Sequence, residues 1–230
     1  IDLKCKNFRY AIPKIIKTIR IIKPDIIIST FPHITLPLVI FKNLFYKELK
    51  IIAREPNMID ASLDHSPYPR LLKYLHKSLM HKVDKIIVTS NAMKNDFISR
   101  GINKEKLYLI HNPVNNSQAR NIKILNRFPG NGLRLVILGR LTYQKGIDRV
   151  IPILKRIKNC HLTIIGDGLD KNKLQKLILD TGVKDKINFI SFSHIANSYV
   201  AAADYLLLPS RWEGLPNVAL EALILGTPVI

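Results

Sequence analysis

Residues 133–165 read LRLVILGRLTYQKGIDRVIPILKRIKNCHLTII and contain the pattern that decides the fold. Residues 133–138 and 161–165 are short apolar runs of the kind that form buried strands. Between them, residues 146–158 have the apolar periodicity of a helix. A strand, a helix and a second strand in this order form a parallel pair, because a parallel connection needs a crossover segment. The stretch therefore predicts an α/β fold whose parallel sheet is covered on both faces.

The same alternation continues on both sides of this stretch. Helices are expected over residues 8–22, 37–49, 71–82, 92–100, 170–180, 195–203 and 217–225, and strands over 26–29, 49–53, 85–90, 107–111, 186–190 and 204–209, with another strand opening at residue 227. Residues 119–132 are rich in Asn and lack strong periodicity, which is typical of a linker. We therefore predict two Rossmann-like domains, residues 1–118 and 133–230, with a ligand cleft between them at the carboxyl ends of the strands.

The composition is that of an ordinary soluble globular protein. Of the 230 residues, 47% are hydrophobic and 23% are charged, which excludes a disordered chain, a collagen and a coiled coil. Two cysteines, Cys5 and Cys160, cannot build a disulfide scaffold or a four-ligand zinc site. The longest uncharged stretch near the N-terminus, residues 26–41, contains two prolines and is too short to span a bilayer. We expect a cytoplasmic protein that associates peripherally with the inner face of the cell membrane.

The charge balance is strongly basic. The chain has 36 Lys and Arg against 17 Asp and Glu, a net charge of +19. Residues 1–118 hold 20 basic and 9 acidic side chains and residues 119–230 hold 16 and 8, so the excess is spread out. A nucleic-acid-binding arm would concentrate it. Two interpretations stay open: compositional drift in a chain rich in Ile and Asn, or a surface that attracts anionic lipid or a phosphorylated ligand.

A first motif whose residues could bind a ligand or act in catalysis is LGRLTYQKG at residues 138–146, between a predicted strand and a predicted helix. Glycine lets the chain turn sharply and lets a ligand approach the backbone. Arg140 offers a planar fork and Lys145 a mobile point charge, a combination that suits a diphosphate. The free N–H groups of the next helix would add to the anion site. The alternative is a pair of solvated cations on a loop.

A second motif is PSRWEGLPNVALEA at residues 209–222, a strand-to-helix turn. It places Glu213 on the loop and Glu221 about one turn into the helix. Carboxylates in such a place can accept hydrogen bonds from sugar or ribose hydroxyls. The alternative is an exposed Glu and a helix Glu paired with a neighbouring cation.

Together, in this order and followed by GTPVI at 226–230, the two motifs resemble glycosyltransferase family 4 (glycosyl transferases group 1), the retaining nucleotide-sugar enzymes with the GT-B fold. The matching pieces are LGRLTYQKGIDRVI at 138–151, TIIGDGLDKNKL at 163–174 and PSRWEGLPNVALEAL at 209–223. IIVTSNAMKNDF at 86–97 and LIHNPV at 109–114 are similar to the N-terminal half of the family. The resemblance spans most of the chain and is diffuse before residue 85.

The resemblance implies a role for each matching residue. It implies catalytic roles for Arg140, Lys145 and Glu213, and donor contacts for Gly139, Ile190, Ser191, Phe192, Gly214, Leu215, Pro216, Asn217 and Glu221. The two cations would hold the donor diphosphate and stabilise the leaving group. Glu213 would contact the transferred sugar and Glu221 the ribose. The amides of residues 214–216 would lie near the sugar and phosphates, and residues 190–193 beside the nucleobase.

The resemblance also indicates an acceptor side. Residues 53–57 read AREPN, which is similar to the Ser-Glu-Arg-Asn type of loop in members that act on bacterial surface polysaccharides. Arg54, Glu55 and Asn57 would therefore meet the donor sugar or the acceptor.

No metal or other cofactor is expected. The chain has no Asp-x-Asp pair to bind a metal at the diphosphate. In GDGLD at 166–170 we interpret Asp167 as a turn residue and Asp170 as a helix N-cap. The same stretch lacks the third glycine of a dinucleotide fingerprint.

The sequence thus predicts transfer of a sugar from a nucleotide diphosphate sugar, UDP-linked, to a glycan or polyprenyl-linked acceptor in bacterial envelope polysaccharide synthesis. Contact with an anionic membrane is expected, and nucleic acid is not. A GT-B-like nucleotide-sugar epimerase and a basic nucleic-acid-binding protein stay open as alternatives, the latter on charge alone. The family pattern implies elements before Ile1 and after Ile230, so the expectation is a fold truncated at both ends, and residues 1–230 alone are not expected to transfer sugar.

Overall fold

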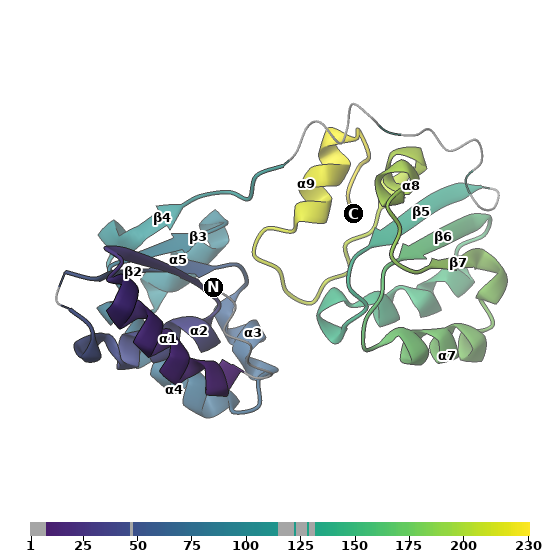
Figure 1. The fold of residues 1–230 in the computed structure, drawn as a ribbon. Coiled ribbons are helices and arrows are strands. Elements are labelled where there is room, and N and C mark those ends of the chain that lie inside the picture. Colours follow the sequence, from purple (N-terminus) through teal and green to yellow (C-terminus); the bar gives the residue numbers. More distant parts are fainter. Residues whose placement is uncertain (1–7, 47, 115–121, 123–127, 129–131) are drawn as a thin grey trace. The chain divides into compact units, whose positions relative to one another are not determined.

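The computed structural model describes residues 8–46, 48–114, 122, 128 and 132–230 (Figure 1). The chain divides into two compact units, Ile1–Asn112 and Pro113–Ile230. The predicted linker, residues 119–132, lies outside the described residues except for Ile122, Phe128 and Gly132. Each unit is an α/β structure with one parallel sheet, which confirms the predicted fold class.

The first unit contains a four-stranded parallel sheet of order β1-β2-β3-β4. Its strands are β1 (Ile26–Thr30), β2 (Lys50–Glu55), β3 (Lys85–Val88) and β4 (Leu107–Leu109). Its α-helices are α1 (Phe8–Ile22), α2 (Pro32–Ile40), α3 (Ile59–Asp64), α4 (Pro69–Leu79) and α5 (Asn91–Ser99), with 3-10 turns at Lys42–Leu44, Met80–Lys82 and Lys104–Lys106.

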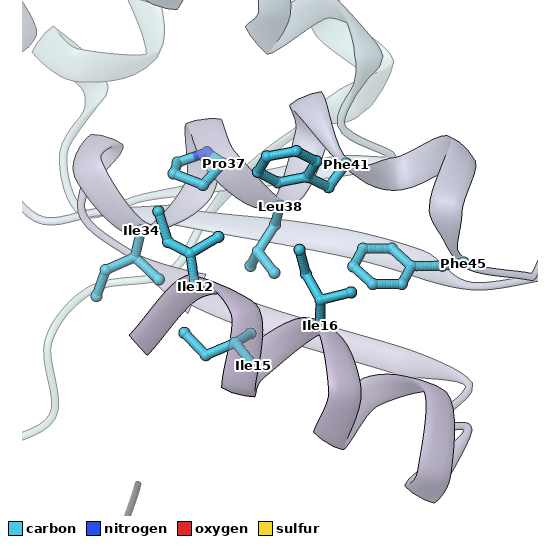
Figure 2. Close-up of a pocket in the computed structure, with 8 residues that line it drawn as sticks. All are labelled: Ile12, Ile15, Ile16, Ile34, Pro37, Leu38, Phe41 and Phe45. Atoms are coloured by element: carbon cyan, nitrogen blue, oxygen red, sulfur yellow. The ribbon is translucent and has the colours of Figure 1, made fainter. Parts of the chain in front are cut away.

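One face of this sheet forms the core of the first unit. Along β2, Ile51, Ala53 and Glu55 are buried, because alternate residues of a strand point to the same face. The parallel register places Ile86 and Val88 of β3 on that face. Helix α1 packs on α2 through a wholly apolar contact (Figure 2). The gap left between the two helices is about 30 Å³, roughly the room of one water molecule, so it is a packing defect and not a ligand site.

The second unit contains a parallel sheet of order β7-β6-β5-β8. Its elements are β5 (Leu133–Leu138), β6 (Cys160–Ile165), β7 (Ile187–Ile190), β8 (Tyr205–Leu206), α7 (Lys171–Thr181), α8 (Ala196–Ala202) and α9 (Asn217–Ile224), with 3-10 turns at Tyr143–Lys145, Ile147–Arg149, Ile151–Arg156 and Lys184–Lys186. Helix α7 and the turns after β5 cover one face, and α8 and α9 cover the other (Figure 1). Val229 pairs in parallel with Leu206, so the last residues extend the sheet as predicted.

Two helix predictions need correction, and one helix was not predicted. The helix expected over 37–49 is α2, which begins at Pro32 and ends at Ile40, because Pro32 takes the first-turn position that we had given to Pro37. The segment 146–158 forms 3-10 turns instead of one α-helix. Pro152 lies inside it without an N–H, so a continuous i to i−4 ladder cannot form there. Helix α3 was not predicted, because a six-residue helix with two buried side chains has almost no periodic signal.

Two titratable side chains are buried together in the first unit. Glu55, at the end of β2, is 1% exposed, and His76 of α4 is 2% exposed. Oε1 of Glu55 and Nε2 of His76 lie 4.0 Å apart, too far for a hydrogen bond, and neither atom has another partner among the described residues. Burial raises the pKa of Glu55 to about 8 and lowers the pKa of His76 to about 4, so both groups are neutral near pH 7.

This burial predicts a pH dependence of stability. Between pH 6.5 and 8 the unfolded Glu55 is ionised, whereas the folded Glu55 keeps its proton until the pH approaches its raised pKa. The free energy of unfolding should therefore fall across this window by about 1–2 kcal/mol. Urea unfolding at pH 6.5 and at pH 8 measures this change in the free energy of unfolding. Glu55→Gln should remove the fall. His76→Gln should retain it, because the low pKa of His76 affects stability only between about pH 4 and 6.5. An undiminished fall in Glu55→Gln would contradict the assignment.

Candidate functional site

The candidate site lies at one edge of the second unit. In a parallel sheet the loops that follow the strands all emerge at the carboxyl edge, where ligands of open α/β sheets bind. Residues 139–146 follow β5, residues 166–170 follow β6, residues 191–195 follow β7 and residues 207–216 follow β8. Both predicted motifs are therefore on this edge, on loops that follow the neighbouring strands β5 and β8.

The two motif loops are bound to each other. Nζ of Lys145 lies 2.7 Å from Oε1 of Glu213, and both side chains are 17% exposed. Beside this ion pair, the Gln144 side chain donates to the Trp212 carbonyl at 3.1 Å, and the Arg211 amide donates to the Gln144 carbonyl at 2.7 Å. Two of the three residues predicted as catalytic are thus in direct contact.

A second ion pair, which the sequence reasoning missed, fixes the same junction. The Arg211 guanidinium donates to both carboxylate oxygens of Asp148, at 2.8 and 2.7 Å. It also donates to the Tyr143 carbonyl at 2.7 Å and stacks 3.9 Å from the centre of the Tyr143 ring. The hydrogen bond from Arg211 holds the pKa of Asp148 below its usual value. The signal was available: Asp148 lies three residues after Lys145, and Arg211 lies two residues before Glu213.

Glycine is required where the two loops meet. Gly146 has a φ of 64° and sits so close to the loop after β8 that a Cβ would lie 2.1 Å from the Pro209 carbonyl oxygen. Gly166 approaches the Gly139 carbonyl in the same way, at 1.9 Å for an added Cβ. The glycines of the first motif were predicted to let the chain turn and to admit a ligand. In the structure, Gly146 admits the neighbouring loop after β8.

An open pocket of about 330 Å³ lies beside the joined loops, at the ends of β5, β6 and β7. Its lining residues are Leu138, Gly139, Arg140, Ile165, Gly166, Asp167, Phe192, Ser193 and Ala196. It thus brings together Gly139, Arg140 and Phe192, all three predicted to be at the site. Arg140 is exposed, and its side chain forms no hydrogen bond or ion pair in the part of the chain that the structure describes.

The other residues predicted beside the nucleobase lie next to this pocket. The Ile190 carbonyl accepts a hydrogen bond from the Gly166 amide at 2.9 Å. The Ser191 hydroxyl accepts one from Nζ of Lys171 at 3.0 Å. Phe192 is 77% exposed, and its ring packs nearly perpendicular to the His194 ring, with the ring centres 5.3 Å apart.

The remaining donor-side residues form the entry to α9. Gly214, Leu215 and Pro216 are half-buried and Asn217 is exposed. Pro216 is the N-cap of α9 and has no N–H, so the expectation of an amide donor at this position is wrong. Glu221 is half-buried, and its carboxylate forms no hydrogen bond or ion pair with any described residue.

The predicted acceptor-side residues lie in the first unit. Arg54 donates to the Asn112 side chain at 2.8 Å, and Asn57 is half-buried. The Glu55 carboxyl is buried beside His76 and, in this conformation, is closed to a ligand. A role of these three residues toward an acceptor stays a prediction.

The aspartates near the pocket are engaged within the chain. Asp167 accepts from the Gly168 amide at 2.8 Å and lies just before the turn at residues 169–170, so its role as a turn residue stays a prediction. Asp170 is at the N-cap of α7 but makes no side-chain capping bond, so that part of the prediction is wrong. Within the described residues, no three His, Cys, Asp or Glu side chains gather in a way that could hold a metal ion.

Comparison with known proteins gives the family. Residues 2–118 match the family Glycosyltransferase Family 4, and residues 119–230 match the family Glycosyl transferases group 1.

Two curated relatives show the extent of the sequence similarity. An uncharacterized glycosyltransferase of Methanocaldococcus jannaschii is 29% identical over 239 residues, covering 94% of this chain and 57% of that protein. The O-antigen biosynthesis glycosyltransferase WclY of Escherichia coli is 29% identical over 152 residues, covering 64% of this chain and 42% of that protein. The chain thus spans about half the length of these relatives.

The fold is also shared with solved structures. Anabaena HepE in complex with UDP superposes with a TM-score of 0.71 at 19% identity, over 95% of this chain and 62% of that one. This likeness confirms the GT-B class that the sequence predicted. The chain belongs to glycosyltransferase family 4.

Proposed function

We propose that this chain contains the donor site of a retaining glycosyltransferase that moves a sugar from a UDP sugar to a glycan or polyprenyl-linked acceptor. The observation that carries the proposal is the Lys145–Glu213 contact, formed by both motifs beside a pocket that Arg140 lines. The relatives supply the chemical class: WclY by its name acts in O-antigen biosynthesis, and HepE binds UDP.

The charges at the site suit the bond that breaks. In glycosyl transfer the bond between the anomeric carbon and the diphosphate oxygen breaks, and negative charge develops on the departing diphosphate. Fixed cations aimed at that oxygen lower the barrier, because they need not reorganise during the reaction. Arg140 and Lys145 would fill this role, so the proposed mechanism needs no metal ion.

The Lys145–Glu213 pair can receive a donor without being separated. The Lys145 ammonium has three N–H donors, and in the described residues only one is used, toward Glu213. The remaining two can donate to a phosphate. The second oxygen of Glu213 can accept from a sugar hydroxyl. One ion pair thus offers a donor to the diphosphate and an acceptor to the sugar, which sets the orientation of the reacting bond.

The acceptor and the cellular setting belong to the same proposal. We place the reaction in envelope polysaccharide synthesis on the cytoplasmic face of the membrane, with Arg54, Glu55 and Asn57 toward the acceptor. Among the described residues, no helix has the length and apolar character needed to cross a bilayer. The excess of cations would favour contact with anionic lipid.

Removing Lys145 should slow transfer. In the active enzyme, Lys145→Ala is expected to lower turnover by on the order of 100-fold, as the loss of one preorganised charge stabiliser does. Release of UDP from a UDP sugar measures it. The matched control is Lys155→Ala, which removes an exposed cation from a 3-10 turn of the same unit. Unchanged turnover in Lys145→Ala would remove this residue from the mechanism.

The two glutamates should have separable effects. Glu221→Gln is expected to weaken binding of free UDP, because its proposed partner is the ribose. Glu213→Gln should leave UDP affinity near the wild-type value and impair transfer, because its proposed partner is the sugar. Titration calorimetry with UDP on both variants tests the difference. Equal losses of affinity would show that the roles are wrongly assigned.

A further inference from the structure

Lys171 joins two of the loops that border the pocket. It is the first residue of α7, the helix that connects β6 to β7 (Figure 1). Its Nζ atom lies 3.3 Å from a carboxylate oxygen of Asp167, in the loop after β6, and donates to the Ser191 hydroxyl oxygen, in the loop after β7, at 3.0 Å. Among the described residues, no other hydrogen bond or ion pair joins residues 191–195 to any element except α8, which follows them directly.

Helix stability does not explain a lysine at this position. The N-terminus of a helix carries partial positive charge, so a cation there is unfavourable. The first turn of α7 has no acidic residue, and Asp170 makes no side-chain capping bond. The Lys171 side chain is 30% exposed and is held by its two contacts. Its position therefore favours a role in the loops beside the pocket over a role in the helix.

The contact with Lys171 determines how the Ser191 hydroxyl can act. An ammonium only donates hydrogen bonds, so the hydroxyl oxygen must be the acceptor. The hydroxyl hydrogen is left for another acceptor, and no described residue accepts it. Ser191 is exposed and directly precedes Phe192 and Ser193, which line the pocket, so that acceptor can belong to a ligand. The ammonium charge also repels the partial positive charge of a second N–H donor that approaches this oxygen.

We infer that Lys171 and Ser191 select a donor nucleotide whose base carries a keto oxygen, such as uracil, over one whose base carries an amino group at the same place. A keto oxygen accepts a hydrogen bond from the Ser191 hydroxyl, whereas an amino group presents a donor to a donor. Four residues that line the pocket are apolar: Leu138, Ile165, Phe192 and Ala196. In a pocket with such walls a few placed polar groups decide specificity. Ser191 contacts the base, and Lys171 is a positioning residue.

The inference deepens the proposed function and rests on it, because it takes the pocket to bind a nucleoside diphosphate. It does not depend on transfer or on uridine. Two pairs of nucleotides differ in a keto oxygen against an amino group: UDP with CDP, and GDP with ADP. The affinity ratio within each pair therefore reports selection by this group, and the choice of pair reports the base that the donor carries.

Titration calorimetry of residues 1–230 with the four nucleotides tests the inference. We expect UDP to bind about tenfold more tightly than CDP. Ser191→Ala and Lys171→Met should each lower this ratio several-fold, because the hydroxyl is lost or is no longer held as a donor. Ser191→Thr and Lys171→Arg should retain most of the ratio, since each keeps the hydrogen-bonding group. The matched control is Lys176→Met, which removes an exposed cation from the same helix.

Each outcome decides the inference. A lower ratio of UDP to CDP affinity in Ser191→Ala and Lys171→Met, but not in the conservative variants or the control, supports it. Equal affinities for UDP and CDP in the wild type overturn it and leave the proposed function standing. An equal loss of UDP and CDP affinity in the variants also overturns it, because the contact would then only hold the loop.

Two further outcomes separate the inference from the proposed donor. A preference for GDP over ADP that both variants lose, without binding of UDP, would support the inference and contradict a UDP sugar as the donor. Absence of binding of all four nucleotides would overturn the inference and the proposed donor site together.

Discussion

The candidate site depends on two ion pairs that join the loop after β5 to the loop after β8. Neighbouring parallel strands deliver these loops side by side, but adjacency alone would leave two mobile segments. The bidentate Arg211–Asp148 pair, stacked on Tyr143, fixes them together, and Gly146 removes the Cβ that would keep them apart. Lys145 and Glu213 then meet at 2.7 Å, beside the hydrogen bonds that Gln144 makes to the loop after β8. A planar guanidinium suits this task better than an ammonium, because its geometry sets the angle as well as the distance.

Under the proposed function, this arrangement would hold the donor site ready before its anionic ligand arrives. Lys145 and Glu213 already hold each other in place, in a partly buried position, before any donor binds. Arg140, by contrast, has no partner in the described residues and is exposed beside the pocket. In the proposed mechanism Lys145 is therefore positioned in advance, and Arg140 would close on a phosphate.

Local patterns predicted the strands and most helices, because each buried strand here is a short apolar run with turn residues at its ends. The placement of both motifs at one edge of the second sheet could be predicted as well, because the carboxyl ends of parallel strands meet at one edge. Prediction was wrong where proline position decides the local structure, in α2 and in the 3-10 turns around Pro152. It missed the Arg211–Asp148 pair and the burial of Glu55, because both depend on which loops and helices become neighbours in three dimensions.

The most direct test of this account is a double-mutant cycle on UDP affinity. If the Arg211–Asp148 pair acts by positioning Lys145, Asp148→Asn should weaken UDP binding about tenfold in the wild-type background. The same change should have little further effect in Lys145→Ala, because the residue that it positions is gone. Calorimetry on the four proteins measures the coupling. Additive losses, or full affinity in Asp148→Asn, would show that the joined loops do not organise the donor site.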